Sequence, residues 1–383
     1  MTSELPHDDL GREWAARRGI RRLLHVDTAA CGRTSDAVRA RIAEHLADES
    51  ATGGYIAADD VQEELDRLRA NLGGLLGFAG DEVAFLESAS TALATLLAAW
   101  PLGAGQTVWA VRSEWGPNLA TFADRGLAVE LLDADDDGRL DLDALAARLR
   151  HERPDAVHLT EATSHRPMVQ PVGAAAEICA AAEVPLIVDC AQSLGQIEIQ
   201  HGAAAVYGTS RKWLCGPRGV GFLAVREPWQ SRLVPVAPAL SAAAWSVGGD
   251  RPLPRLGSRE ASVANHLGLG VALAEYLELG PERIRERLHA TAIALRSALA
   301  EAPGWRLVGA IDAPGALVTL VPARDDLDVP EFRAELLRRG VLSTACQPER
   351  APRELTGYVL RFSPHLETTI EDIEQVAKHV TDM

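Results

Sequence analysis

The chain has 383 residues, of which 47% are hydrophobic, and a formal net charge of −16 without any block of basic residues. Length and apolar content predict a soluble globular protein of two or three domains with a full-sized core. The negative charge disfavours a nucleic-acid backbone or an anionic membrane surface as a partner, so neither is expected.

The five cysteines are odd in number, scattered along the chain, and lack the spacing of a zinc site or a disulfide framework. They indicate a reduced, cytoplasmic protein with no bound metal. The first eleven residues are acidic and contain no apolar core, so no signal peptide is expected. The most apolar run, residues 89–100, is followed by Pro101 and is too short to span a bilayer.

Short apolar runs alternate with helical patterns through the first two thirds of the chain. The expected strands are 83–86, 107–111, 128–132, 156–160, 185–189, 203–207 and 220–225. Helical patterns such as 61–76, 142–150 and 172–182 lie between them. This alternation predicts a wound α/β fold with a mostly parallel sheet, which binds ligands at the carboxyl ends of its strands.

Beyond about residue 258 the pattern becomes α+β. A long helical pattern over 265–302 is broken at Gly280 and Pro281, and strands at 316–321 and 358–362 follow, with helices at 330–339 and from 369. We expect an N-terminal segment 1–24 that packs with the small domain, a large domain 25–258 and a small C-terminal domain 259–383.

Lys212 lies in a glycine-rich turn within residues 207–222 and is one of only two lysines in the chain. Arginine cannot lose its proton, whereas a desolvated lysine can become a neutral amine, attack a carbonyl and act as a general base. The pattern therefore favours Schiff-base chemistry over a surface lysine. The glycine spacing matches neither a dinucleotide fingerprint nor a phosphate loop, so no nucleotide is expected.

Three further features lie at the ends of expected strands. Asp189 ends the strand 185–189, where its carboxylate could hold a heterocyclic nitrogen protonated or cap the next segment. Ala89 and Ser90 begin a helix directly after a strand, which suits either ordinary capping or a phosphate. Trp115 follows the strand 107–111 and could stack on a planar ring or simply pack.

Three motifs, Asp189-Cys-Ala-Gln192, Thr209-Ser-Arg-Lys-Trp213 and Gly216-Pro-Arg-Gly-Val-Gly221, together resemble the class V branch of the fold-type-I pyridoxal-phosphate enzymes. The similarity extends from residue 25 to residue 365. It implies pyridoxal 5'-phosphate as cofactor, a large wound α/β domain with a smaller α+β domain, and a homodimer with shared active sites.

The resemblance also implies a role for each matched residue. Lys212 would form the Schiff base with the cofactor, Asp189 would pair with the pyridine nitrogen, and Gln192 would donate to the ring hydroxyl oxygen. The residues matched to the phosphate site are Ala89, Ser90, Thr209, Arg211 and, from the neighbouring subunit, Ser258. Trp115 would stack on the ring, and Ser164 stands where many members have an asparagine near the ring oxygen. Arg361 would clamp the substrate α-carboxylate, a task that suits a planar guanidinium.

Less general motifs are similar to the carbon–sulfur lyases of ergothioneine biosynthesis, which cleave a hercynylcysteine sulfoxide by β-elimination. These motifs lie at 53–57, 114–118, 158–160, 164–166, 210–213 and 343–346, the last followed by Arg350-Ala-Pro352. They imply an amino-acid substrate with a sulfur leaving group. A trimethylammonium group on it would be received by aromatic faces or carboxylates, and the candidates are Tyr55, Trp115, Trp245, Asp27 and His25.

Other interpretations remain open. Cys346 lies near the position where cysteine desulfurases keep their persulfide-forming thiol, in a segment 344–348 that we expect to be a loop, but no lysine or histidine is near it in the sequence. An isopenicillin-epimerase-like enzyme is a second alternative. A non-catalytic binding protein of the same fold would usually carry a DNA-binding segment, for which residues 1–24 are too short.

Overall fold

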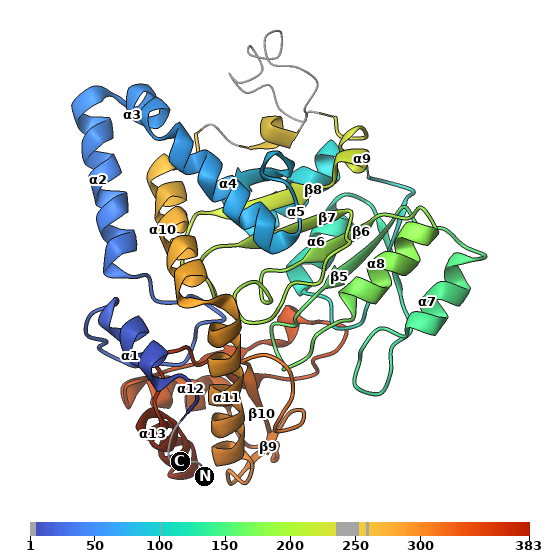
Figure 1. Ribbon diagram of the computed structural model, residues 1–383. Coiled ribbons are helices and arrows are strands. Elements are labelled where there is room, and N and C mark those ends of the chain that lie inside the picture. The colour runs from blue at the N-terminus through green and yellow to red at the C-terminus, as the bar shows by residue number, and fades with distance from the viewer. Residues whose placement is uncertain (1–4, 101, 235–252, 258–259) are drawn as a thin grey trace.

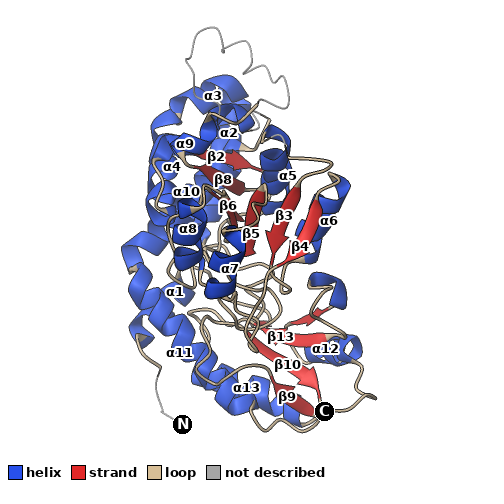
Figure 2. Cartoon of the chain, turned by 90° about the vertical axis from the view of Figure 1, so that its right-hand side faces the viewer, coloured by secondary structure: helices blue, strands red, loops and turns tan. Residues whose placement is uncertain are grey.

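The computed structural model describes residues 5–100, 102–234, 253–257 and 260–383. A seven-stranded sheet flanked by helices forms the larger part, and a four-stranded sheet with its own helices forms the smaller part, below it in Figure 2.

The central sheet has the strand order β2-β8-β7-β6-β5-β3-β4. Its strands are β2 (Val83–Leu86), β3 (Thr107–Ala110), β4 (Ala128–Leu131), β5 (Ala156–Thr160), β6 (Leu186–Asp189), β7 (Ala205–Thr209) and β8 (Gly221–Val225). The five strands from β7 to β4 are parallel, whereas β8 is antiparallel to both β7 and β2. The turn from β7 to β8 is too short for a crossover, which explains the antiparallel pair. The predicted mostly parallel, wound sheet is confirmed.

Alternation along each strand divides the core between the two faces of the sheet. Residues such as Val157 and Val188 pack on the face covered by α4 (Gln62–Leu76), α7 (Leu142–Leu149) and α8 (Val172–Ala181). Ile187 and Tyr207 pack on the opposite face, under α5 (Ala89–Ala99) and α6 (Gly116–Asp124). His158 and Asp189 therefore also point to the α5 and α6 face.

Polar caps set where several helices begin. In six of the described helices the N-cap side chain accepts a hydrogen bond from the backbone N–H three residues later. These caps are Ser35, Ser88, Asp141, Ser262, Asp328 and Thr369.

Two consecutive helices connect the larger and smaller parts (Figure 1). Helix α10 (Val263–Leu279) packs against α2 (Asp36–Thr52) and α4, and α11 (Pro281–Leu299) packs against α13 (Ile370–Thr381). Gly280 has φ 89° between them, as the predicted break requires. Helix α1 (Asp8–Ala16) is tied to α11 by an ion pair of 2.6 Å between Asp8 and Arg287. The expected domain limits at residues 24 and 258 stay a prediction, because α10 begins beyond residue 258 and yet packs on helices of the larger part.

The small sheet is antiparallel, with the order β12-β13-β10-β9. Its strands are β9 (Trp305–Leu307), β10 (Val318–Pro322), β12 (Thr344–Cys346) and β13 (Val359–Phe362), and α12 (Val329–Arg338) lies beside it. The strand β1 (Leu24–His25) pairs in parallel with β11 (Val341–Leu342). The remaining short helices are α3 (Gly54–Asp60), α9 (Glu227–Gln230) and the 3-10 turns Gly80–Glu82, Leu253–Leu256 and Pro348–Arg350.

The prediction of a loop at 344–348 is wrong for residues 344–346. Cys346 pairs with Val359 in the small sheet and has no exposed surface. The pairing partner lies 13 positions further along the chain, so the local pattern around Pro348 gave no sign of the strand.

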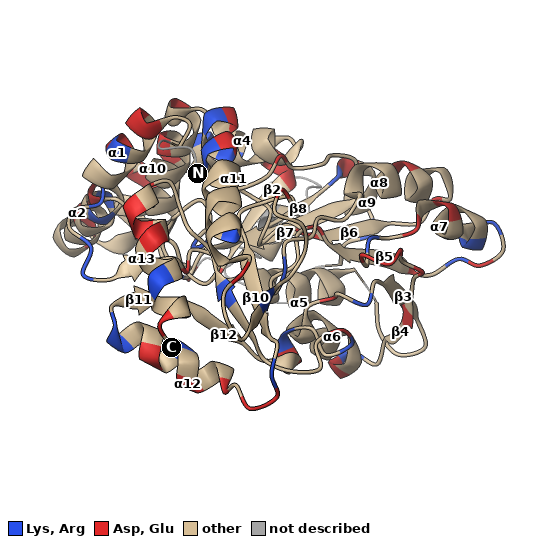
Figure 3. Cartoon of the chain, turned by 90° about the horizontal axis from the view of Figure 1, so that it is seen from below, with Lys and Arg blue, Asp and Glu red and all other residues tan. Residues whose placement is uncertain are grey.

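Acidic and basic residues are interspersed along the outer helices, as along α4, α12 and α13 in Figure 3. None of the five cysteines forms a disulfide. No helix in the described part of the chain has the length and apolar character needed to cross a membrane.

Candidate active site

A cavity of about 240 Å³ lies at the carboxyl ends of the central parallel strands. The residues predicted to bind the cofactor line it together: Ala89, Ser90, Trp115, Ser164, Asp189, Gln192, Thr209, Arg211 and Lys212. Ser258 and Trp245 lie outside the described residues. A wider cavity of about 660 Å³ on the small sheet contains none of the predicted residues, so the chemistry is assigned to the smaller one.

Lys212 occupies the turn between β7 and β8. Burial lowers the pKa of its ammonium group to about 7, and the positive charges of nearby arginines act in the same direction, whereas the charge of Asp189 opposes them. A lysine with this pKa is about half neutral at pH 7 and can act as a nucleophile and a base.

Asp189 ends β6 and is 4% exposed. Its Oδ1 accepts a hydrogen bond of 2.8 Å from the backbone N–H of Ala191, and its Oδ2 accepts one of 3.1 Å from the side chain of Asn118. Burial raises the pKa of this carboxyl, whereas the positive charge of Lys212 opposes the shift. Asp189 thus presents a fixed, poorly solvated acid to the cavity.

A second buried acid lies beneath Asp189. Glu114 is fully buried, and its Oε1 accepts hydrogen bonds from the Thr160 hydroxyl at 2.6 Å and the Asn118 amide at 2.8 Å. His158 bridges the Glu114 Oε2 at 2.8 Å and the Tyr207 hydroxyl at 3.0 Å. Asn118 therefore contacts both acids. This network was not predicted; the one signal for it was a histidine inside the apolar run 156–160.

The start of α5 forms one end of the cavity. Ser88 caps the helix by accepting a hydrogen bond of 3.1 Å from the N–H of Thr91, and the N–H groups of Ala89 and Ser90, in the first turn, have no acceptor within the helix. A side chain at Gly221 would overlap the backbone of Ser88. This glycine therefore lets β8 support the turn that faces the cavity.

Arg211 and Thr209 lie on the same lining surface. One Nη of Arg211 donates to the carbonyl of Ala30, and burial lowers the pKa of its guanidinium. The hydroxyl of Thr209 donates to the carbonyl of Val220 at 3.2 Å. The remaining guanidinium N–H groups and the helix start together form a cationic, donor-rich cradle for an anion.

Gln192 is held by two hydrogen bonds of 3.0 Å: its amide donates to the Ala29 carbonyl, and its oxygen accepts from the Trp213 indole. A primary amide has two N–H groups, so one remains for a ligand. Ser164 uses its backbone carbonyl to accept from Arg361 at 2.7 Å, and its side chain faces the same cavity.

Arg361 lies beside the cavity and is not among the residues that line it. It is fully buried, and it also pairs with Asp27 at 3.2 Å. Asp27 accepts a further hydrogen bond of 2.5 Å from the Thr344 hydroxyl. The structure thus brings Asp27 and Arg361 together as a pair. Asp27 follows β1 and contacts Thr344 of β12, and Arg361 of β13 contacts Ser164 at the cavity wall.

The structure does not bring the other two predicted substrate-binding residues into the cavity of their own chain. Tyr55 lies on α3 and is 80% exposed. His25 lies in β1, where its charge acts on Glu367 and His365. Tyr55 was chosen from a motif match, which cannot show toward which surface the helix turns.

Arg350 was missed as a site residue, although it lines the cavity. It follows β12 in the 3-10 turn Pro348–Arg350. The sequence offered no signal except its membership of a motif, because an arginine after a proline-containing turn is ordinarily a solvated side chain.

The residues present fit pyridoxal phosphate. The cradle of Arg211, Thr209 and the α5 start suits its phosphate, the buried Asp189 suits its pyridine nitrogen, and the partly neutral Lys212 suits its aldehyde. Among the described residues, no group of His, Cys, Asp and Glu is placed to hold a metal ion.

A wound sheet with this lysine and aspartate at its carboxyl edge defines a pyridoxal-phosphate-dependent enzyme of fold type I. The chain belongs to the aminotransferase class-V family, whose model matches residues 24–376.

Similar proteins cover different shares of the chain. It is 42% identical over 375 residues to a probable hercynylcysteine sulfoxide lyase of Mycobacterium tuberculosis, covering 97% of this chain and 93% of that protein. It is 30% identical over 182 residues to the cysteine desulfurase IscS of Tolumonas auensis, covering 45% and 44% of the two chains. The crystal structure of the cysteine desulfurase CsdA from Escherichia coli superposes with a TM-score of 0.84 at 17% identity, covering 97% and 98%.

Proposed function

We propose that the chain is a carbon–sulfur lyase that performs β-elimination on hercynylcysteine sulfoxide. The elimination yields the sulfenic acid of ergothioneine, pyruvate and ammonia, and a thiol reductant then converts the sulfenic acid to ergothioneine. The near full-length similarity to a protein named as such a lyase supports this substrate.

The structural observation that carries the choice is the burial of Cys346. A desulfurase needs an accessible thiol of lowered pKa to accept sulfur from its substrate, whereas Cys346 is a strand residue with no exposed surface. A lyase needs no such thiol, because the sulfur atom leaves as part of the departing group and is not transferred to the protein. A cysteine desulfurase is the alternative, favoured only by the partial similarity to those enzymes.

In the proposed reaction, each polar group of the cavity has one task. Bound pyridoxal phosphate supplies an electron sink for the charge left when a substrate loses its Cα proton. The Nζ of Lys212 removes that proton as a general base, which its pKa of about 7 permits. Asp189 holds a proton on the pyridine nitrogen, and Arg361 orients the α-carboxylate.

The bond changes then balance without an added oxidant. The Cα proton goes to Lys212, the Cβ–sulfur bond breaks, and sulfur leaves with the bonding electron pair. Water hydrolyses the three-carbon fragment to pyruvate and ammonia. Trp115, at the cavity wall, offers an aromatic face to a planar ring or to a trimethylammonium group.

We also propose a cytoplasmic homodimer with shared active sites. Leu46 on α2 and Tyr55 and Ile56 on α3 are 51%, 80% and 57% exposed, and large apolar side chains grouped in this way suit an interface. Ile56→Asp should convert a dimer to a monomer in light scattering coupled to gel filtration; a wild-type monomer would contradict this proposal.

The function is tested with the purified protein and its Lys212→Ala variant. The visible absorbance band of bound cofactor should change in the variant, and pyruvate should form from hercynylcysteine sulfoxide with the wild type only. Alanine and sulfide from free cysteine would instead identify a desulfurase, and no reaction with either substrate after addition of pyridoxal phosphate would favour a non-catalytic protein.

A further inference from the structure

The cavity contains one guanidinium without an acceptor in the described chain. Arg211 donates to Ala30, and Arg361 donates to Ser164 and Asp27. Arg350 lines the same cavity, and its Nε is buried without a hydrogen-bond partner. Burial lowers the pKa of the Arg350 guanidinium, and the charges of Arg361 and Arg211 act in the same direction, whereas the charge of Asp27 opposes them. A charged group in this position is stabilised when an anion arrives.

The segment that carries Arg350 is fixed at both ends. At one end, the first residue of α6, Gly116, lies so close to the carbonyl of Glu349 that a side chain would overlap it. At the other end, Glu354 pairs with His165 at 3.2 Å and with Arg166 at 2.5 Å. Ala351 between them is fully buried. Arg350 is therefore held over the cavity by the packing of its own backbone.

Arg350 acts on Lys212 less strongly than the other two arginines of the site. Among the positive charges that lower the pKa of Lys212, Arg211 has the largest effect, Arg361 the next and Arg350 the smallest. In the proposed reaction Arg361 binds the α-carboxylate, and Arg211 belongs to the phosphate cradle, so Arg350 is the guanidinium of the cavity wall that neither task uses. Arg350 then faces a part of the substrate beyond the sulfur.

We propose that Arg350 binds a carboxylate on the leaving group, so that the enzyme selects sulfur amino acids whose departing half is anionic. This inference rests on the proposed lyase function and specifies its substrate class. A guanidinium binds a carboxylate through two parallel N–H donors, a geometry that neither lysine nor glutamine reproduces. Free cysteine carries no second carboxylate and would leave Arg350 unpaired.

The test compares two substrates with the holoenzyme. S-(2-carboxyethyl)-L-cysteine sulfoxide carries a carboxylate on its leaving group, and S-methyl-L-cysteine sulfoxide does not. Wild type should prefer the first in kcat/KM, and Arg350→Gln should reduce that preference by on the order of 10- to 100-fold, mainly through KM. Arg353→Gln, at an exposed residue of the same segment, is the matched control and should keep the preference.

Gly116→Ala provides a second variant. It keeps the arginine at position 350 but displaces the segment that carries it, so it should also reduce the preference. An equal loss on both substrates in Arg350→Gln would assign Arg350 to the α-carboxylate and overturn the proposal. An unchanged preference would overturn it as well.

A binding measurement separates this inference from the proposed function. The thioether S-(2-carboxyethyl)-L-cysteine should change the cofactor absorbance with a Kd at least tenfold higher in Arg350→Gln than in wild type. A higher Kd in Arg350→Gln would support the role of Arg350 even if neither sulfoxide yielded pyruvate. The absence of pyruvate would contradict the lyase reaction alone. Equal Kd values for wild type and Arg350→Gln would contradict the role of Arg350 and would leave the proposed lyase reaction unaffected.

Discussion

The Nδ1 of His158 lies 2.8 Å from the Oε2 of Glu114, and neither side chain has exposed surface. Burial alone would raise the pKa of Glu114, but the charge of His158 and the hydrogen bonds from His158, Thr160 and Asn118 outweigh it and lower the pKa. The negative charge of Glu114 in turn raises the pKa of Asp189. Asp189, which faces the cavity, is therefore linked through Asn118 to a second buried acid, whose charge raises the pKa of Asp189.

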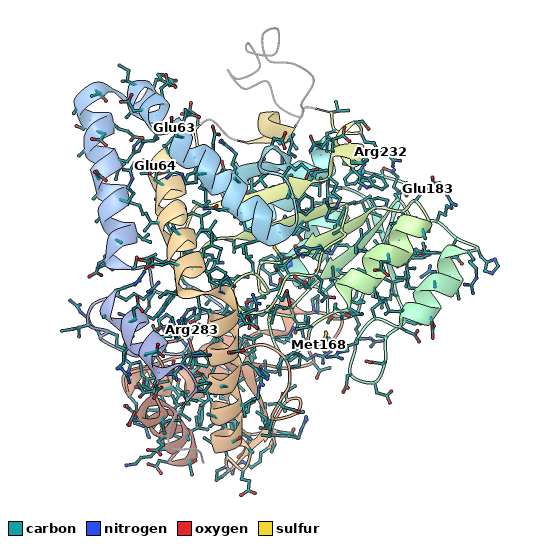
Figure 4. All side chains as sticks on the ribbon, viewed as in Figure 1. Glu63, Glu64, Met168, Glu183, Arg232 and Arg283 are labelled. Atoms are coloured by element: carbon teal, nitrogen blue, oxygen red, sulfur yellow. The ribbon has the colours of Figure 1, made fainter. Side chains whose placement is uncertain are left out.

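Removing Glu114 should destabilise the protein. Glu114→Ala removes the acceptor of the His158 Nδ1 and Thr160 hydroxyl groups and one of the two acceptors of the Asn118 amide, and loss of one partner from such a buried pair costs about 3–5 kcal/mol. We expect a clearly lower thermal midpoint for the apoprotein. Glu63→Ala, at an exposed glutamate on α4 (Figure 4), is the control and should lie within about 0.5 kcal/mol of wild type. A midpoint equal to that of the control would show that the network contributes nothing.

The low pKa of Lys212 predicts the pH dependence of its reactivity. Only the neutral amine reacts with an acylating reagent, so in the apoprotein the rate at Lys212 should be half-maximal at about pH 7 and level above it. An ordinary lysine would continue to gain reactivity up to about pH 10.4. The measurement is mass spectrometry of the labelled peptides, with exposed Lys378 on α13 as the reference in the same digest. A rate that still rises steeply between pH 8 and 9 would refute the shift.

The same pKa has a consequence for the stability of the apoprotein. The folded-state pKa lies below the ordinary value of 10.5, so between pH 7 and 10.5 the unfolded chain binds a proton that the folded chain does not. The cost of burying Lys212 is therefore complete below pH 7 and disappears as the pH rises toward 10.5.

The sequence pattern predicted the central strands, and the family resemblance selected nine residues that the structure places around one cavity; their roles toward the cofactor stay a prediction. Asp189 and Lys212 each lie at a strand end, and parallel strands bring their carboxyl ends to one edge. Glu114 and His158 could not be paired in this way. They are 44 positions apart, and their contact depends on the strand order β5 beside β3, which a local pattern does not contain. Arg350 was missed for a similar reason, since Gly116 of α6 and the pair His165 and Arg166 hold its segment from distant parts of the chain.

Cys346 provides a test that separates the two candidate reactions. Because the thiol is buried in β12, Cys346→Ala should change the kcat for pyruvate formation by less than about threefold, although the small cavity it leaves should lower stability by about 1 kcal/mol. In a desulfurase, the same Cys346→Ala substitution would instead abolish the transfer of sulfur to an acceptor and the release of sulfide. Labelling of Cys346 by a thiol reagent in the native protein would contradict the burial on which this prediction rests.

Gly221 should control cofactor affinity without contacting the reacting atoms. An alanine side chain there would overlap the backbone of Ser88 and displace the start of α5, where N–H groups face the cavity. Since φ at Gly221 is not positive, the effect is steric and not a matter of backbone strain. We expect Gly221→Ala to raise the Kd for pyridoxal phosphate by on the order of 10- to 100-fold, because two charge-assisted hydrogen bonds to the phosphate would be partly weakened.

Gly74→Ala is the matched control, because no atom lies within 4 Å of the side chain it would add. Titration of both apoproteins with the cofactor, followed by absorbance, gives the two Kd values, and equal values would show that the α5 start does not depend on the close approach of β8.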